Sequence, residues 1–169
     1  MTTSIAETPR PPAHLAKELI ASSGFLLARL GFGFKSKALA KLDEAGFDPY
    51  HYSVLAILDE RPQQTQAMIA DACALDPSRL VAVLDSLEER SLIERKRDPE
   101  DRRRHIVTST AAGKRKLTRL REIVKELEDE FFGALDASER KQLHELLERV
   151  AAHVDPRCAF GPKPAEPKP

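Results

Sequence analysis

Residues 76–113 read DPSRLVAVLDSLEERSLIERKRDPEDRRRHIVTSTAAG and contain the pattern that decides the fold. Apolar residues three and four positions apart over residues 80–87 predict an amphipathic helix. A hydrophobic step at Leu92 and Ile93 follows, and then a basic hairpin whose tip carries Asp-Arg-Arg-Arg at residues 101–104. A helix with small polar residues on its outer face can enter a major groove while an arginine-tipped hairpin reaches a neighbouring minor groove. The stretch therefore predicts a winged helix that reads DNA.

The same helical periodicity continues on both sides of this stretch. Glycines at Gly31 and Gly33 are expected to bend the first helix, and Gly46 to stop it. Asp-Pro pairs at 48–49 and 76–77 place a capping side chain before a proline at the first helical position. We expect helices over about residues 13–44, 48–61, 64–73, 76–90, 111–132 and 136–154, and strands near 92–96 and 105–109. The predicted fold class is mainly α with a small β-hairpin wing, a winged helix-turn-helix flanked by a helical dimerisation region.

The ends of the chain are polar and contain prolines. We expect a disordered N-terminal tail at residues 1–12 and a proline-rich disordered tail at residues 155–169. The ordered body, residues 13–154, is expected to hold dimerisation helices at about 13–45 and 111–154 and a DNA-binding lobe at about 47–110. Apolar stripes on the outer helices predict a homodimer, and its candidate contact residues are Leu15, Leu19, Leu143, Leu146, Leu147 and Val150.

Composition limits the other classes of function. The net charge is zero, but residues 95–104 hold six basic and three acidic residues, and residues 122–130 hold five acidic residues and one lysine. This separation gives one basic surface on a neutral chain, as a DNA-binding protein needs. No apolar run reaches the length of about 20 residues that spans a membrane. We expect a cytoplasmic protein with no membrane partner, and no phosphate-binding loop or nucleophile motif indicates an enzyme.

The order of elements and several motifs resemble the MarR (multiple antibiotic resistance regulator) family of winged-helix transcription factors. The matching segments are Leu87-Glu88, Leu92-Ile93-Glu94-Arg95, Asp98-Pro99-Glu100-Asp101-Arg102-Arg103 and Thr110-Ala-Ala-Gly113, with Phe47-Asp48-Pro49 upstream. The resemblance covers roughly residues 15–153. Ser91 stands where the family usually has glycine, and His51 where glutamine is common. The resemblance implies a dimeric, sequence-specific repressor of transcription that binds double-stranded DNA at a pseudo-palindromic site and is released by a small molecule.

The resemblance also implies roles for individual residues. Arg103 would enter the minor groove, Asp101 would hold it by an ion pair, and Arg102 and Arg104 would contact phosphate or the neighbouring groove wall. On the recognition helix, Arg79 can bind guanine through two hydrogen bonds, and small neighbours allow close approach to the bases. Asp85, on the same helix, is tolerable near phosphate only if an arginine pairs with it. The full set of candidate DNA-binding residues is Ser78, Arg79, Ala82, Ser86, Lys96, Arg97, Asp101, Arg102, Arg103 and Arg104.

Members of the family often bind an anionic or phenolic effector, and others sense peroxide through a cysteine. The candidate effector residues here are Arg29, Tyr50, His51 and Tyr52, for which packing roles of Tyr52 and His51 are the alternative. Cys73 is expected to be a small buried hydrophobic residue rather than a redox sensor, and Cys158 lies in the tail. The histidines show no metal-ligand spacing, and we expect no metal or cofactor. A winged-helix module that binds only protein, and a cysteine-based redox-sensing regulator, remain the alternative functions.

Overall fold

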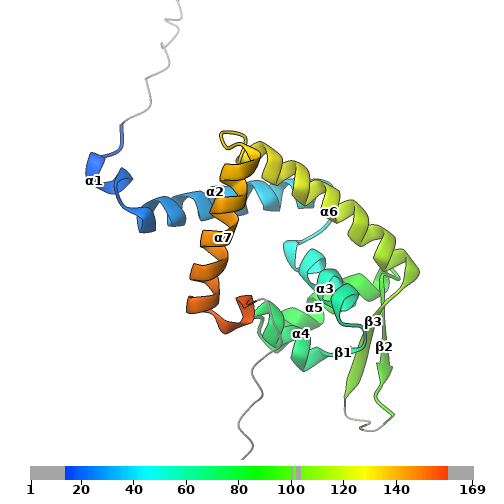
Figure 1. The fold of residues 1–169 in the computed structure, drawn as a ribbon. Helices are drawn as coiled ribbons and strands as arrows, with labels where there is room; N and C mark the ends of the chain where they lie inside the picture. Colours follow the sequence, from blue (N-terminus) through cyan, green and yellow to red (C-terminus); the bar gives the residue numbers. More distant parts are fainter. Residues whose placement is uncertain (1–13, 100, 102–103, 160–169) are drawn as a thin grey trace, which may run out of the picture. The chain divides into compact units, whose positions relative to one another are not determined.

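The computed structural model describes residues 14–99, 101 and 104–159, and its elements follow the predicted order (Figure 1). The chain divides into two compact units, residues 1–36 and 37–169. The first unit holds α1 (Lys17–Ile20) and the beginning of α2 (Ser23–Glu44). α2 continues through both glycines to Glu44, as expected, and the bend at Gly31–Gly33 stays a prediction; the helical interruption lies instead at residues 21–22, where the sequence indicated none. Ser22 accepts a hydrogen bond from the backbone of Phe25 there, as a capping serine does.

The second unit contains the DNA-reading region that the sequence predicts. It consists of α3 (Pro49–Glu60), α4 (Gln66–Cys73), α5 (Pro77–Glu89) and a small antiparallel sheet, followed by α6 (Ala111–Phe131) and α7 (Ala137–Val154). Asp48 and Asp76 cap α3 and α5, each before a proline, as expected. Asp136 forms the expected capping box with Glu139 at the beginning of α7. Local sequence therefore determined where these helices begin.

The sheet has three strands in the order β1-β3-β2, one more than the sequence indicated. β2 (Ile93–Arg97) and β3 (His105–Ser109) form the predicted hairpin, with Arg95 opposite Val107. The third strand, β1 (Gln64–Thr65), pairs with Ile106 and Val107 of β3. The sequence predicted these two residues as the beginning of a helix, but α4 begins at Gln66, after Thr65 caps it. A two-residue strand carries too little alternation to be recognised without its partner strand.

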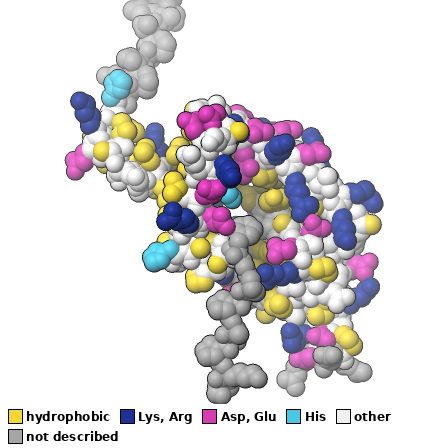
Figure 2. Space-filling view, in the orientation of Figure 1, with side chains coloured by type: hydrophobic (Ala, Val, Ile, Leu, Met, Phe, Trp, Pro, Cys, Tyr) yellow, Lys and Arg dark blue, Asp and Glu magenta, His cyan; other side chains and the backbone are white. Residues whose placement is uncertain are grey.

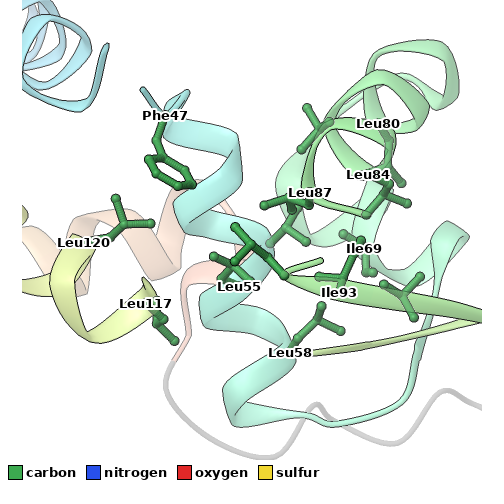
Figure 3. Close-up of a cluster of buried hydrophobic side chains, with 14 of the residues drawn as sticks. Phe47, Leu55, Leu58, Ile69, Leu80, Leu84, Leu87, Ile93, Leu117 and Leu120 are labelled. Carbon is green, nitrogen blue, oxygen red and sulfur yellow. The ribbon is translucent and has the colours of Figure 1, made fainter. Parts of the chain in front are cut away.

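The core of the second unit lies between α3, α5, the sheet and the first half of α6 (Figure 3). Leu55 and Leu58 of α3 lie at its centre, facing Leu84 and Leu87 of α5 and Ile93 of β2. The predicted apolar stripe of α5 is confirmed, because Leu80, Val83, Leu84 and Leu87 are all buried. Burial of a leucine contributes about 1.5–3 kcal/mol, so this core holds the helices and the hairpin as one body.

Three helices end in a left-handed residue, and only one of these residues is glycine. Gly46, Ala74 and Ser91 have φ angles of 74°, 51° and 57°. In each case the next residue's N–H bonds back five positions, as Leu92 does to Leu87, which is the Schellman pattern. The sequence predicted the stop at Gly46 correctly. At Ser91 the helix closes with the same geometry despite the side chain, which costs about 1 kcal/mol or more.

The C-terminal segment is ordered further than the sequence indicated. Residues 155–169 were expected to be a disordered tail, but Pro156–Cys158 form a 3-10 turn. Arg157 donates to the backbone carbonyl oxygen of Asp71 on α4 at 2.9 Å, and to the carboxylate of Asp155. The hydrogen bonds that the Arg157 side chain and backbone donate to the Asp155 carboxylate lower the pKa of Asp155 to about 2. The helix does end at Val154, as the prolines predict.

Candidate nucleic-acid interface

Helices α4 and α5 form the helix-turn-helix, and capping controls the turn between them. Ala74 ends α4 in the left-handed conformation, and the Asp76 carboxylate accepts from the backbone N–H of Arg79 at 3.0 Å to begin α5. The buried stripe of α5 rests on the core, so its opposite side faces solvent. Ser78, Arg79 and Ala82 are exposed, whereas Ser86 is half-buried. The exposed side of the first two turns of α5 therefore consists of Arg79, small side chains and Val81.

Asp85 lies on the same side of α5, where an unpaired carboxylate would be repelled by DNA phosphate. In the structure an arginine of the wing pairs with it. The Arg95 guanidinium on β2 lies 2.6 Å from the Asp85 carboxylate and also binds the Glu88 carboxylate through Nε at 2.8 Å. The backbone N–H of Arg95 donates to Glu88 as well, at 3.1 Å. Hydrogen bonds from Arg95 lower the pKa of Glu88, and those to Glu88 raise the pKa of Arg95. Asp85, Glu88 and Arg95 together join the recognition helix to the wing. The sequence pattern included Glu88 and Arg95 but did not predict that they bind each other.

The wing carries the remaining predicted DNA contacts. Lys96, Arg97 and Arg104 are exposed on the hairpin, and Lys96 pairs with Glu94 at 2.8 Å. Backbone bonds from Asp98 to Arg104 and from Arg104 to Asp101 close the end of the hairpin. Glu100, Arg102 and Arg103 lie outside the described residues, and so does the expected ion pair between Asp101 and Arg103.

A hollow of about 480 Å³ lies between the beginning of β3, close to the tip of the wing, and the beginning of α4. Arg104 and His105 form one side of it, and residues 65–68 form the other. A helix N-terminus presents unpaired backbone N–H groups, which favour an anion such as a phosphate.

Figure 2 shows lysine and arginine side chains along the side of the molecule where Figure 1 places α6 and the hairpin. Aspartate and glutamate side chains lie among them on that side (Figure 2).

The junction between the wing and α6 explains the Thr-Ala-Ala-Gly motif. Thr110 caps α6 by accepting from the Gly113 N–H at 3.0 Å, and its hydroxyl donates to the Ser91 carbonyl oxygen at 2.8 Å. The Thr110 N–H donates to the carbonyl oxygen of Leu92. Gly113 lies so close to Leu92 that an added Cβ would be 2.1 Å from that same oxygen. The motif is therefore needed for packing of α6 against the recognition helix and wing.

The residues predicted to bind an effector make different contacts in the structure and do not all point to one ligand site. His51 is buried, and its Nδ1 accepts from the backbone N–H of Asp48 at 3.0 Å, which completes a capping box. An Nδ1 that accepts a hydrogen bond carries no proton, so the neutral imidazole caps α3, and burial lowers the pKa of His51 in the same sense. The ring of Tyr50 lies under the guanidinium of Arg79, and Tyr52 packs against the core. Arg29 belongs to the first unit, and its place in an effector site stays a prediction.

A second hollow, of about 500 Å³, lies beside Phe47, where the sequence named no effector residue. Arg90 lies over the Phe47 ring at 4.9 Å and bonds to the Gly46 carbonyl oxygen, and Lys116 lies over the same ring at 5.1 Å. The lining comprises Leu39, Ala40, Asp43, Gly46, Phe47, Asp48, Pro49 and Arg90. The sequence feature that could have indicated this hollow is Phe47, an apolar residue between Gly46, which ends one helix, and Asp48-Pro49, which begin the next.

The remaining predicted residues are a cysteine and the apolar residues of the outer helices. Cys73 is partly buried against the core, and burial raises the pKa of its thiol. Among the described residues no cluster of potential ligands suits a metal ion, and no helix is long and apolar enough to cross a membrane. Of the dimerisation candidates, Leu143 is half-buried, and Leu15, Leu19, Leu146, Leu147 and Val150 are exposed in the single chain.

Comparisons with known proteins identify the family. The family model described as MarR family matches residues 48–105, which include the helix-turn-helix and most of the wing. A protein from Thauera aromatica, named as a transcriptional regulatory protein for the hcr operon, is 30% identical over 135 residues, 75% of this chain and 81% of that protein. The chain belongs to the MarR family. The MarR-like order of elements inferred from the sequence is thereby confirmed, and this protein is similar to regulators of transcription.

Solved MarR-family structures share the fold over almost their whole length. A structure of the transcriptional repressor CouR bound to a 23-mer DNA duplex has a TM-score of 0.73 and is 32% identical, covering 82% of this chain and 99% of that chain. CouR from Rhodococcus jostii RHA1 bound to p-coumaroyl-CoA has a TM-score of 0.67 and is 28% identical, covering 87% and 100%. The predicted fold class is confirmed by these similarities.

Proposed function

We propose that this protein is a homodimeric, sequence-specific repressor of transcription, which binds a pseudo-palindromic duplex and leaves it when a small effector binds. The observation that carries the proposal is the exposed face of α5, small side chains around Arg79, next to a basic hairpin tied to that helix by Arg95. This arrangement fits a recognition helix in the major groove with a wing beside it. The similarity to DNA-bound CouR supports the same use.

Each proposed DNA contact has a distinct task. Arg79, Ser78, Ala82 and Ser86 face the bases, whereas Lys96, Arg97 and Arg104 supply positive charge along the phosphates. Arg103, supported by Asp101, enters the minor groove next to Arg102. Arg95 is not a DNA contact in this scheme, because its guanidinium is already engaged by two carboxylates.

The proposed dimer is formed by the helices at about residues 13–45 and 111–154, around a DNA-binding lobe at about 47–110. In the single chain α7 buries none of its residues, and Leu146 and Val150 are 57% and 54% exposed. An apolar stripe of this kind on a regular helix indicates a protein partner. A second copy related by twofold symmetry would cover it and place two recognition helices about 34–36 Å apart. Sedimentation should give a dimer at micromolar concentration.

The proposed effector is an aromatic, anionic molecule, and p-coumaroyl-CoA is the first probe because CouR binds it. Arg29 and Tyr50 remain effector candidates, whereas His51 is a structural residue whose Nδ1 is already bonded and Tyr52 packs against the core. The hollow beside Phe47 offers Arg90 as a further cation. An effector releases DNA only if it binds more tightly to a protein conformation that does not fit the DNA site. Each tenfold loss of DNA affinity requires a difference of about 1.4 kcal/mol in the effector's binding free energy between the two conformations.

The test begins with selection from a randomised duplex library, followed by titration of the selected site at several salt concentrations. We expect a palindromic site, affinity that falls steeply with salt, and strong weakening by Arg103→Ala with unchanged thermal stability. Absence of any selected site would refute the proposal and favour a module that binds only protein. The raised pKa of Cys73 does not favour a redox-sensing regulator, because the thiolate is the reactive form.

A further inference from the structure

Arg79 is held by an aromatic ring of a different helix. Its guanidinium carbon lies 4.7 Å from the centroid of the Tyr50 ring, so the first turn of α5 meets the first turn of α3. Tyr50 is the second residue of α3 and Arg79 the third residue of α5. Both helices begin with an aspartate cap followed by proline, and the backbone N–H groups of Tyr50 and Arg79 both donate to those caps. The backbone on each side of this contact is therefore fixed.

The ring itself is fixed as well. Tyr50 is half-buried and packs against the hydrophobic core of the second unit. A guanidinium over a ring face is attracted by the ring quadrupole, and its N–H groups stay available at the edge for other acceptors. Tyr50 can thus restrict Arg79 without occupying the donors that would recognise a base.

Other arginine side chains near the recognition helix already form hydrogen bonds or ion pairs within the protein. Arg95 is bonded to Asp85 and Glu88, and Arg90 to the Gly46 carbonyl oxygen. Among the residues that the structure describes, the side chain of Arg79 makes no hydrogen bond or ion pair, and the contact with Tyr50 is what restrains it. A flexible arginine loses rotamer freedom when it binds a base, and a restrained one loses less.

We propose that Tyr50 is a positioning residue for DNA recognition: its ring holds the Arg79 guanidinium so that its paired donors select one base, guanine, in each half-site. This inference rests on the proposed function, since it assumes that α5 reads bases. Tyr50 touches Arg79 and does not itself contact DNA. The alternative, that the ring holds Arg79 away from the groove, makes the opposite prediction for the same variants.

The experiment uses the full-length protein and the duplex selected by the wild type from a randomised library. Arg79→Ala first identifies the base pair whose preference depends on this arginine. Preference at that pair, the ratio of affinities for guanine and adenine duplexes, is then measured for Tyr50→Leu, Tyr50→Phe and Tyr52→Leu. Tyr52 is a matched control, because it is a half-buried tyrosine of the same helix that also packs against the core.

A bidentate arginine discriminates between bases by roughly fivefold to a hundredfold. We expect Tyr50→Leu to lose at least about fivefold of that preference, and Tyr50→Phe and Tyr52→Leu to retain it. In the Arg79→Ala background, Tyr50→Leu should change nothing further. Thermal unfolding of each variant separates a loss of folding from a loss of selectivity.

The outcomes separate the inference from the proposed function. If the wild type selects a site and Tyr50→Leu keeps or increases its preference for guanine, the positioning role is refuted while DNA binding stands. An equal loss in the Arg79→Ala background would also refute it, because the effect would not pass through Arg79. If the wild type selects no sequence, both the proposed function and this inference fail.

Discussion

Substitution of Gly113 by alanine tests whether close packing of α6 on the wing holds the DNA-reading region together. The new Cβ would lie 2.1 Å from the Leu92 carbonyl oxygen and 2.7 Å from the Ser109 hydroxyl, whereas real Cβ atoms essentially never approach within 3.0 Å. The backbone of α6 or the backbone at Leu92, just before β2, must therefore move, because a carbonyl oxygen cannot rotate away as a flexible side chain can. That movement would strain the bond between the Thr110 N–H and the same oxygen, now 3.0 Å long.

The expected loss of stability combines two effects. Overpacking costs about 1–3 kcal/mol, and a weakened hydrogen bond about 0.5–1.5 kcal/mol. A total of about 3 kcal/mol corresponds to a fall in Tm of roughly 6–12 °C for a chain of this size. Thermal unfolding followed by circular dichroism measures it directly.

Gly31→Ala is the matched control, because a Cβ at that position would meet nothing within 4 Å. It lies within α2, so alanine should leave Tm unchanged or raise it slightly through helix propensity, by up to about 1 kcal/mol. If Gly113→Ala unfolds within about 2 °C of the wild type, the close approach at Leu92 is not a constraint, and the packing argument for the motif is wrong.

Three further predictions concern single residues. Ser91→Gly should stabilise the protein by about 0.5–1 kcal/mol in guanidinium unfolding, because Ser91 has a φ of 57°, and a lower unfolding midpoint would contradict this. Since burial holds the pKa of His51 below its usual 6.5, protonation favours the unfolded chain, and stability should fall as pH falls through 6.5 toward the lower folded pKa. His51→Gln keeps an acceptor for the capping box and should flatten that part of the pH–stability curve, whereas an unchanged slope would assign it to other groups. Leu147→Glu should give monomers in sedimentation, because a charge cannot be buried unpaired in the proposed interface, and a stable dimer would place the interface elsewhere.

Local signals in the sequence were sufficient for most helix boundaries and for the order of elements. Asp48-Pro49 and Asp76-Pro77 begin helices because a carboxylate cap and a proline act within one turn and need no distant partner. The buried stripe of α5 was also predictable, since a spacing of three and four residues places those side chains on one face of any helix. The break at residues 21–22 was missed because two glycines further along gave a stronger local signal than Ser22.

Only the tertiary structure decided how side chains far apart in the sequence are used. β1 exists because β3 provides its partner, and His51 is a cap rather than a ligand group because the beginning of α3 is buried. The pairing of Asp85 with Arg95 and the contact of Tyr50 with Arg79 join separate elements. Sequence determines which groups a helix presents on each face, because the helical repeat is short and regular. Which of those groups meet depends on how the elements pack, and packing is set by the whole core at once.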